Sequence, residues 1–298
     1  MRKKIITLIL CLAVFQINAI AQAFPVKLKN GNTSLRDLVD PTLQSRLEKS
    51  LNNNQYWKSL IAKKKMAVGV VDLSNPDKVR FARVNGNHMM YAASLPKIAV
   101  LLAAMDAIEK GELKETSEVK NDMKLMISKS NNQATTRMID RLGYEKIENV
   151  LTDDRYGLYD EEFGGGLWVG KRYASGGGKT NLEPLKNLSH AATVSQVCRF
   201  YYLLLQGKLV NEKRSKQMLD IMENPALHHK FVRTLEMIAP QARLFRKSGS
   251  WRTYHSDSIL VWGSPTRRYI LVALIDDANG EQIIRDLVIP VEKVINGK

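Results

Sequence analysis

The sequence predicts an α/β protein of the α+β type, with an antiparallel sheet formed from both chain ends, flanked by helices, and an inserted all-helical lobe. Three observations predict it. Runs rich in β-branched residues lie near both ends of the chain, and turn residues separate them at short intervals. The middle of the chain instead shows apolar residues at helical spacing. Further helical patterns precede the first strand and close the chain, so they can cover the sheet.

The N-terminal part supplies the first two predicted strands. Residues 24–40 show no regular pattern, whereas residues 42–65 place apolar side chains on one helical face. Residues 66–73 (MAVGVVDL) form a β-branched run that a Ser-Asn-Pro turn ends. Residues 79–84 are predicted to be the hairpin partner of this strand.

Helical periodicity dominates the middle of the chain, and we expect the inserted lobe over roughly residues 111–222. Helices are predicted over residues 95–110, 120–128, 133–142, 190–207 and 212–222. Residues 153–179 contain eight glycines, and a loop of this length in a compact domain is usually functional or disordered.

The C-terminal part returns to strands. Residues 242–249, 255–263 and 268–275 are predicted as three consecutive strands joined by tight turns, and residues 280–295 as a closing helix. Residues 24–298 are therefore expected to form one domain.

The N-terminus resembles an export signal rather than part of the fold. Residues 2–4 are basic, residues 5–15 are apolar, and Ala21-Gln22-Ala23 has the small-x-small pattern of a cleavage site. We expect a signal peptide over residues 1–23 and a periplasmic or secreted mature protein. An N-terminal membrane anchor is the alternative. No later segment is long and apolar enough to span a membrane.

Composition limits the class of protein. The chain has 298 residues, of which 44% are hydrophobic and 25% charged, as in soluble globular proteins. The formal net charge of +15 would suit nucleic acid, but the export signal and the scattered basic residues argue against that partner. Attraction to anionic cell-wall or membrane surfaces and a merely solvated basic surface both remain open.

Ser94 and Lys97 are the first candidate catalytic pair. Ser94 opens a strong helical run, and the three-residue spacing places Lys97 on the same helical face, where its amine could take the hydroxyl proton. The positive end of a helix also favours an anionic nucleophile. An S-x-x-K motif alone occurs by chance, and a capping serine followed by an ordinary helix lysine explains it equally well.

Two further motifs change this interpretation. Ser130-Asn131-Asn132 lies between helical stretches, and Lys247-Ser248-Gly249 ends a predicted strand. The order S-x-x-K, S-x-N, K-[ST]-G resembles class A β-lactamases and penicillin-binding proteins, over roughly residues 42–298. A helix cap at Ser130 and a surface lysine at Lys247 are the alternatives, which the joint occurrence of the motifs weakens.

The resemblance implies roles for the matching positions. Ser94 would attack the carbonyl of a β-lactam or of an acyl-D-alanine group, Lys97 would assist as base, and Ser130 would pass a proton to the leaving nitrogen. Asn132 would bind the side-chain amide of the substrate, and Lys247 and Ser248 would bind its carboxylate. Gly249 would let the substrate lie close to the strand backbone. The N–H groups of Ser94 and Ser250 would bind the oxyanion.

Two departures from the family pattern stand out. The interval between Ser94 and Ser130 is short, which implies a trimmed lobe and leaves the shape of the cleft open. Glu183-Pro184-Leu185-Lys186-Asn187 resembles the E-x-x-L-N segment whose glutamate activates the hydrolytic water, but Lys186 replaces the leucine and the segment lies late. Glu161 and Glu162 are competitors for this role, and Glu183 can also be an ordinary surface carboxylate.

The remaining candidates give no cofactor. After signal cleavage Cys198 is the single cysteine, so no internal disulfide is possible, and its apolar surroundings predict a buried core thiol. His228 and His229 have no partner spacing for a metal site, and His255 is expected to be a core or edge residue rather than a cleft residue. We predict a metal-free and cofactor-free enzyme.

Three functions remain in view. The leading one is a monomeric, exported, class A-like β-lactamase that hydrolyses the β-lactam amide through an acyl-enzyme on Ser94. The second keeps the site but changes the substrate to a D-alanyl-D-alanine peptide, as in a penicillin-binding carboxypeptidase. The third is a non-catalytic cell-wall-binding relative, against which the intact Ser94, Lys97, Ser130 and Lys247 argue.

Overall fold

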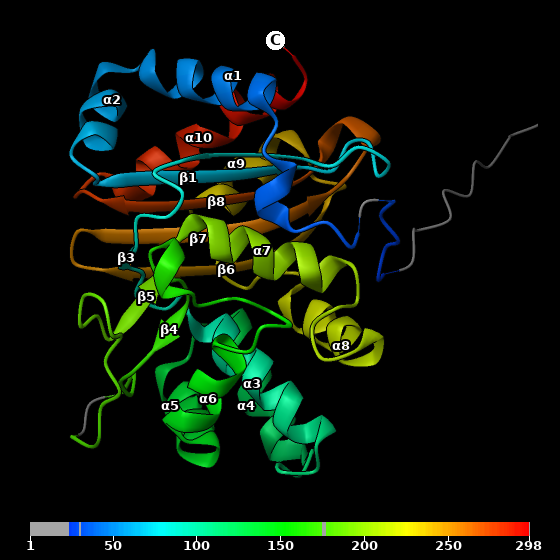
Figure 1. Ribbon diagram of the computed structural model, residues 1–298, viewed down its shortest axis with the longest axis vertical. Coiled ribbons are helices and arrows are strands. Elements are labelled where there is room, and N and C mark those ends of the chain that lie inside the picture. Colours follow the sequence, from blue (N-terminus) through cyan, green and yellow to red (C-terminus); the bar gives the residue numbers. More distant parts are fainter. Residues whose placement is uncertain (1–23, 30, 175–176, 298) are drawn as a thin grey trace, which may run out of the picture.

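An antiparallel sheet built from both ends of the chain is the centre of the molecule, as predicted (Figure 1). The computed structural model describes residues 24–29, 31–174 and 177–297, so the expected signal peptide lies outside the described residues. The five strands are β1 (Met66–Asp72), β2 (Arg80–Val84), β6 (Arg243–Trp251), β7 (Tyr254–Trp262) and β8 (Arg268–Asp276). Their order in the sheet is β2-β1-β8-β7-β6.

Strand β1 contributes side chains to the apolar clusters on both faces of the sheet. Val68 and Val70 of β1 point into one apolar cluster, whereas Ala67 and Val71 point into the other. Because side chains alternate along a strand, β1 must be apolar at nearly every position to bury both faces. Its partner β8 pairs antiparallel with it, with Val70 opposite Leu271.

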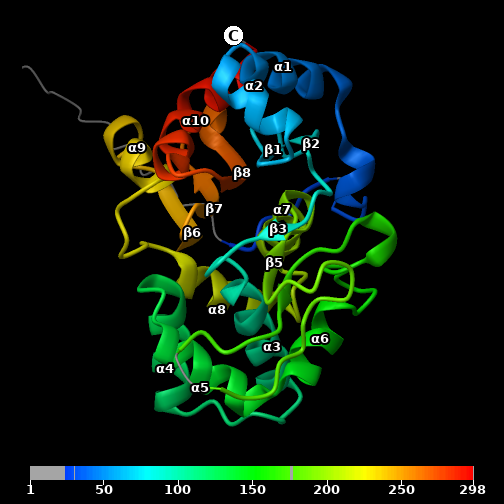
Figure 2. The ribbon, with the colours of Figure 1, turned by 90° about the vertical axis from the view of Figure 1, so that its left-hand side faces the viewer.

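Helices cover the two faces of the sheet unequally (Figures 1 and 2). One face carries α1 (Pro41–Asn52), α2 (Gln55–Ala62), α9 (Phe231–Ile238) and α10 (Gly280–Ile295). The other face packs against α7 (Val194–Leu205). The two chain ends therefore supply one cover, and a helix from the middle of the sequence supplies the other.

The helical lobe lies on the side of the sheet that bears α7 (Figure 2). Its helices are α3 (Lys97–Glu109), α4 (Ser117–Ser128), α5 (Asn132–Leu142), α6 (Tyr144–Leu151) and α8 (Glu212–Met222). Helix α3 is buried along nearly its whole length and contacts α4, α5, α6 and α8. The expected range of 111–222 thus leaves out this central helix and includes α7, which packs on the sheet.

Several local elements differ from the sequence expectation. The helix predicted over residues 42–65 is broken into two, because the Asn54 side chain caps α2 by accepting from the Tyr56 and Trp57 N–H groups. Strand β5 (His190–Ala192) occupies the start of the helix predicted from residue 190, and Thr193 caps α7 instead. Helices α6 and α9 were not anticipated.

A second, three-stranded sheet lies beside the lobe. Strands β3 (Met90–Tyr91), β5 and β4 (Trp168–Val169) form it in that order, with antiparallel pairing. The glycine-rich segment contains β4 and a short 3-10 helix, η2 (Glu161–Phe163). Another short 3-10 helix, η1 (Leu35–Leu38), lies in the N-terminal segment for which no regular structure was predicted. This small sheet fixes the segment that precedes Ser94.

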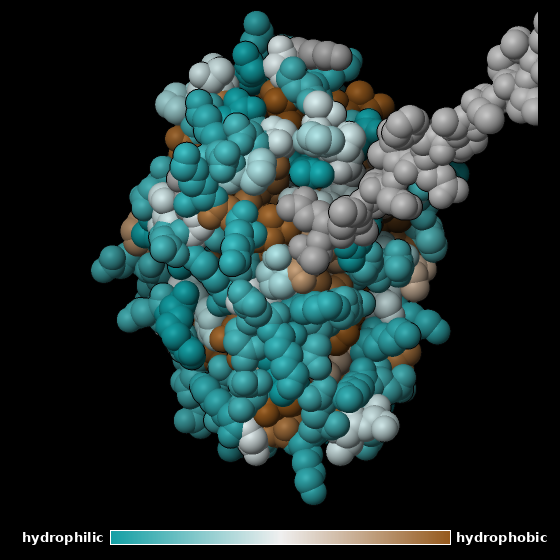
Figure 3. Space-filling model, turned by 90° about the vertical axis from the view of Figure 1, so that its right-hand side faces the viewer, coloured by the Kyte–Doolittle hydropathy of each residue, from teal (hydrophilic) through white to brown (hydrophobic). Residues whose placement is uncertain are grey.

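Hydrophilic residues make up most of the face seen in Figure 3, and hydrophobic residues show as separate patches between them. Within the described residues, no helix is long and apolar enough to cross a membrane.

Cys198 is a buried free thiol, as expected, and burial raises its pKa. Its Sγ lies against Gly69 of β1, where a Cβ atom would come within 2.8 Å of the sulfur and 3.3 Å of the Val194 Cβ. A glycine is needed in β1 because α7 packs this close to the sheet.

We predict that Gly69→Ala lowers the free energy of unfolding by about 1–3 kcal/mol, since it overpacks the contact between β1 and α7. Chemical denaturation measures the change. In the double variant Gly69→Ala with Cys198→Ala, the loss should be smaller than the sum of the two single losses, because removing the sulfur makes room for the methyl group. Gly177→Ala is the control, since nothing lies within 4 Å of the added Cβ. Additive losses would contradict the assignment of strain to this contact.

Candidate active site

Ser94 lies in a tight turn between β3 and α3. The preceding residue, Ala93, has a φ of 49°, in the left-handed region that residues with side chains rarely adopt. The Leu95 N–H donates to the Ala92 carbonyl at 3.1 Å, which closes the turn. In the described part of the chain no oxygen accepts a hydrogen bond from the Ser94 N–H or contacts its Oγ at hydrogen-bond distance. The nucleophile candidate and its own N–H are therefore both available to a ligand.

Gly249 holds this turn against the sheet. A Cβ atom at Gly249 would lie 2.5 Å from both the Ala92 carbonyl oxygen and the Ser94 nitrogen. Any side chain there would therefore push β6 away from the start of α3. Glycine is needed here because β6 lies directly against the backbone of Ala92 and Ser94. This contact brings the K-S-G motif beside Ser94.

Lys97 is fully buried in the first turn of α3. Its Nζ donates to the Ser130 carbonyl at 2.7 Å and to the Asn132 Oδ1 at 2.7 Å, and lies 3.4 Å from the Ser130 Oγ. Each of these acceptors is neutral, so burial is uncompensated by any carboxylate contact and lowers the pKa of Lys97 to about 7. Near neutral pH the amine can therefore accept a proton.

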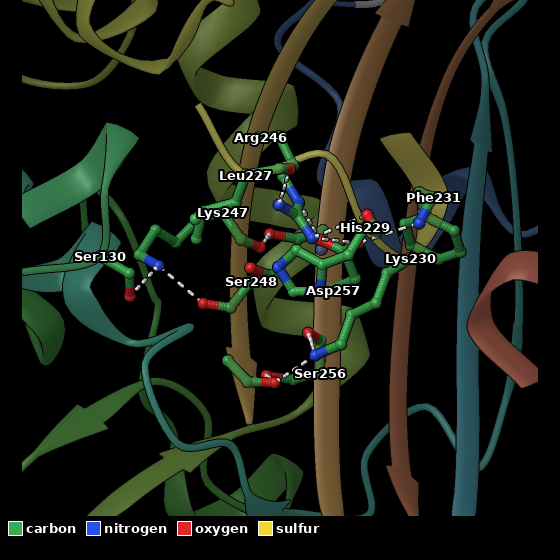
Figure 4. A network of polar contacts seen from close by, with 12 residues as sticks. Ser130, Leu227, His229, Lys230, Phe231, Arg246, Lys247, Ser248, Ser256 and Asp257 are labelled. Atoms are coloured by element: carbon green, nitrogen blue, oxygen red, sulfur yellow. Dashed lines mark hydrogen bonds and ion pairs between the residues drawn. The ribbon is translucent and has the colours of Figure 1, made fainter. Parts of the chain in front are cut away.

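Ser130 joins two lysines. Its backbone is strained, with a φ of 54°. Its Oγ accepts from Lys247 Nζ at 2.9 Å (Figure 4). The same Oγ also accepts from Lys97 Nζ at 3.4 Å. Asn131 provides the cap of α5 by accepting from the Ala134 N–H at 2.8 Å, so Ser130 is not the helix cap. The hydroxyl is thus held for contact with the two amines.

Lys247 is not a surface lysine, because it is 1% exposed on β6. Its Nζ also donates to the Ser248 carbonyl at 2.6 Å. Burial first, and then the nearby charge of Lys97, holds the pKa of Lys247 well below its usual value. An anion bound here would restore the charged form.

A third buried lysine, Lys230, was missed in the sequence. It precedes α9 at a φ of 57°, is fully buried, and donates to the Gly249 carbonyl at 2.6 Å, the Ser250 Oγ at 2.8 Å and the Ser256 carbonyl at 3.1 Å. Burial lowers its pKa to about 8. It supports the end of the K-S-G motif, where Ser250 follows Gly249. No motif or periodicity in the sequence marks this residue.

A buried ion pair holds the loop that carries Lys230. Arg246 of β6 donates to both oxygens of Asp257 of β7, at 2.7 and 2.9 Å, and to the Leu227 carbonyl at 2.9 Å (Figure 4). Asp257 also accepts from the Phe231 N–H at 3.2 Å. Each charge has its partner and extra hydrogen bonds, which is the condition for a buried pair to persist.

The cleft around Ser94 has a volume of about 910 Å³. Its walls combine the expected Ser94, Asn132 and Ser250 with an aromatic group made of Tyr91, Tyr173, His190, Trp251 and Tyr254. The Tyr173 ring lies 4.6 Å from Lys97 Nζ, and its hydroxyl donates to the Ala93 carbonyl at 3.1 Å. The described residues that line the cleft include no carboxylate.

Glu183 lies outside the cleft lining and is fully buried. One carboxylate oxygen accepts from the Tyr159 hydroxyl and the Leu185 N–H, each at 2.6 Å, and the other accepts from the Lys186 N–H at 2.8 Å. These bonds close the turn that begins at Glu183. Its side chain is neither exposed, as a surface carboxylate would be, nor directed at Ser94. Its competitors Glu161 and Glu162 are exposed.

The structure thus brings together the residues of three motifs. Ser94, Lys97, Ser130, Asn132 and the segment from Lys247 to Ser250 meet where β6, the start of α3 and the loop before α5 converge. His255 lies beside Gly280 of α10, outside the cleft lining. Among the described residues, no group of three or more His, Cys, Asp or Glu side chains could hold a metal ion.

This fold and this set of motifs define the superfamily of serine β-lactamases and penicillin-binding proteins. The chain matches the family described as the beta-lactamase enzyme family over residues 46–124 and 115–289, and it belongs to that family. The family is one of hydrolases. No curated protein matches the sequence.

Solved structures share the fold at low sequence identity. A β-lactamase from Sphaerobacter thermophilus has 16% identity and a TM-score of 0.64, over 84% of this chain and 95% of that one. A representative of class A β-lactamase from Bacteroides cellulosilyticus has 18% identity and a TM-score of 0.63, over 87% and 100%. The L158E mutant of PBP-A, an acyl-enzyme complex with penicillin G, has 17% identity and a TM-score of 0.63, over 86% and 97%.

We predict that Glu183→Ala lowers the free energy of unfolding by about 2–4 kcal/mol, because the buried Tyr159 hydroxyl and the Leu185 and Lys186 N–H groups lose their shared acceptor. Thermal and chemical denaturation measure the change. Glu161→Ala is the matched control, since this exposed carboxylate belongs to the same connection between α6 and β5 and should change stability by less than about 0.5 kcal/mol. Equal stabilities of the two variants would show that the turn does not depend on the Glu183 carboxylate.

Proposed function

We propose that this chain is an exported serine hydrolase that forms an acyl-enzyme on Ser94 with β-lactams or acyl-D-alanyl peptides. The observation that carries the proposal is the chain of contacts from Lys97 through the Ser130 hydroxyl to Lys247, beside Ser94, whose Oγ has no hydrogen-bond partner among the described residues. A serine needs a neighbouring base to become a nucleophile, and the buried amine of Lys97 provides one.

In the proposed acylation step, Lys97 acts first as the base and Ser130 later as the proton donor. Lys97 takes the Ser94 proton as the Oγ attacks the carbonyl carbon, and the N–H groups of Ser94 and Ser250 stabilise the oxyanion. Collapse of the tetrahedral intermediate breaks the amide bond. The proton returns from Lys97 through the Ser130 hydroxyl to the leaving nitrogen, so that protons balance over the step.

The cations beside the cleft select an anionic substrate. Lys247 and Ser248 would receive the carboxylate, and Lys230 holds the Ser250 hydroxyl in place beside them. Asn132 would bind the side-chain amide of the substrate while it fixes Lys97. A substrate without a carboxylate would give the charged form of the buried Lys247 no anionic partner, which is costly.

Release of the acyl group is the step that the site supports least. The described cleft residues include no carboxylate, and the Glu183 carboxylate is engaged in its own turn. The Tyr173 ring also covers Lys97. These observations favour the second candidate, a penicillin-binding type that deacylates slowly toward β-lactams, over a fast class A-like β-lactamase.

We predict that fluorescent penicillin labels the mature protein covalently and that the label persists, with little nitrocefin turnover. Ser94→Ala should reduce labelling by about a thousandfold or more, because the nucleophile is lost. Ser128→Ala is the matched control, since that hydroxyl donates to the Lys124 carbonyl within α4 and lies outside the cleft lining. Undiminished labelling of Ser94→Ala would contradict the proposed nucleophile, and rapid nitrocefin hydrolysis by the wild-type protein would contradict slow release.

We predict that the second-order rate of acylation rises with pH through neutrality. Only the unprotonated amine of Lys97 can accept the Ser94 proton, and its pKa is about 7. Below that value the rate should fall about tenfold per pH unit, and above it the rate should level off. Stopped-flow labelling between pH 5 and 8 measures the profile. A flat profile across this range would contradict a general-base role for Lys97.

A further inference from the structure

A second cavity, of about 240 Å³, lies apart from the cleft and shares no lining residue with it. Three arginines line it from three different elements: Arg36 from η1, Arg83 from β2 and Arg199 from α7. The serine hydrolase function proposed above makes no use of this cavity.

Two of these arginines have no carboxylate partner. Arg36 lies 3.6 Å from Asp160, whereas neither Arg83 nor Arg199 lies within ion-pair distance of any carboxylate of the described residues. Both are half-buried, and burial together with the charge of Arg36 lowers the pKa of each guanidinium. Half-buried cations without a carboxylate in contact lose part of their hydration, and an anion bound beside them would offset that cost.

The cavity presents hydrogen-bond donors. Arg83 Nη1 donates to the Ser195 Oγ at 3.4 Å, and Arg199 Nη1 donates to the Ser34 Oγ at 3.2 Å. Each hydroxyl therefore accepts from a guanidinium and keeps its own O–H free to donate to a ligand. The Arg199 Nε is bonded to the Tyr156 carbonyl, which fixes the plane of that guanidinium.

The backbone is shaped to hold Arg83 in this position. A Cβ atom at Gly86 would lie 2.2 Å from the Arg83 Cδ and 2.8 Å from the Ser195 Oγ, so only glycine lets these side chains meet. The aromatic rings of Phe81 and Phe163 form apolar walls, and the Arg36 guanidinium lies 3.4 Å above the Phe163 ring. One acidic residue, the exposed Asp37, also lines the cavity.

We propose that this cavity binds a phosphoryl group. Two guanidinium groups and two hydroxyl donors reach the cavity from several sides, and a phosphoryl group offers them three terminal oxygens and a larger negative charge than the two oxygens of a carboxylate. The volume exceeds that of phosphate alone, which leaves room for a small attached group against the aromatic walls. The phosphoryl group can belong to a soluble phosphorylated molecule or to the headgroup of an anionic lipid.

Isothermal titration calorimetry of the mature protein with inorganic phosphate and with glycerol 3-phosphate tests the site. We expect saturable binding at one site, with affinity about tenfold or more weaker in Arg83→Gln and in Arg199→Gln, because each loses charge-assisted hydrogen bonds. Asp37→Asn should bind more tightly, since it removes the one negative charge of the lining. Arg233→Gln is the control, because this exposed arginine of α9 lies outside the cavity lining.

Two vesicle compositions distinguish the sources of the phosphoryl group. Cosedimentation with phosphatidylglycerol vesicles, but not with phosphatidylcholine vesicles, that Arg83→Gln abolishes and Arg233→Gln retains would identify a lipid headgroup. Binding of glycerol 3-phosphate without cosedimentation would identify a soluble ligand. Labelling of Ser94 by penicillin should be unchanged in Arg83→Gln, so failure of this site is separable from failure of the proposed reaction.

Arginine modification tests the same site in the wild-type protein, without any substitution. Phenylglyoxal should modify Arg83 and Arg199 of the wild-type protein more slowly when inorganic phosphate is present, whereas Arg233 should react at the same rate. Absence of saturable phosphate binding, equal affinities in all the variants, or equal protection of all three arginines would overturn the proposal.

Discussion

Two buried amines that share one hydroxyl set the electrostatics of the cleft. Lys97 and Lys247 both contact the Ser130 Oγ, at 3.4 and 2.9 Å, and neither contacts a carboxylate of the described residues. Burial lowers the pKa of both amines, and for Lys247 the nearby charge of Lys97 lowers it further. The pair therefore holds fewer protons than two exposed lysines would. Lys97 can then act as a base, and Lys247 gains its charge fully when an anion arrives.

The rest of the fold serves to hold these amines in place. Lys97 comes from the first turn of α3, Ser130 from the loop before α5, and Lys247 from β6, so lobe and sheet must be fixed relative to one another. The contact between Gly249 and the turn at Ser94 fixes them most directly. The ion pair of Arg246 and Asp257, with the loop of Lys230, then rigidifies β6 from its other side.

The sequence predicts most of this framework but not its fine structure. Strand and helix periods located the five-stranded sheet, and the ordered motifs located Ser94, Lys97, Ser130 and Lys247. The sequence does not indicate the role of Lys230, because that role depends on a left-handed backbone conformation and on contacts with strands that only the fold brings near. Strand β5 was mistaken for the start of a helix because three residues next to a strong helical run carry no period of their own. The burial of Glu183 could not be predicted from the sequence either, since a carboxylate that closes its own turn can have the same local sequence as one that faces a cleft.

Release of the acyl group is the step for which the described cleft differs most from what a fast class A β-lactamase needs. Hydrolysis of an acyl-serine needs a base that holds a water molecule against the ester, and a carboxylate is suited to this because it accepts a proton without being repelled by the neighbouring lysines. Here the side chain above Lys97 is the Tyr173 ring, which neither ionises near neutral pH nor leaves an oxygen beside the amine, because its hydroxyl is directed at Ala93. Glu183 is held by three donors, and freeing it would break the turn that positions the wall of the cleft from Leu188 to His190. Of the described residues at the cleft, the groups that can accept a proton near an ester on Ser94 are Lys97 and the imidazole of His190, whose two ring nitrogens already contact the Ser189 Oγ and the Lys171 carbonyl. Under the proposed function, the lifetime of that ester separates an enzyme that destroys β-lactams from one that β-lactams inhibit.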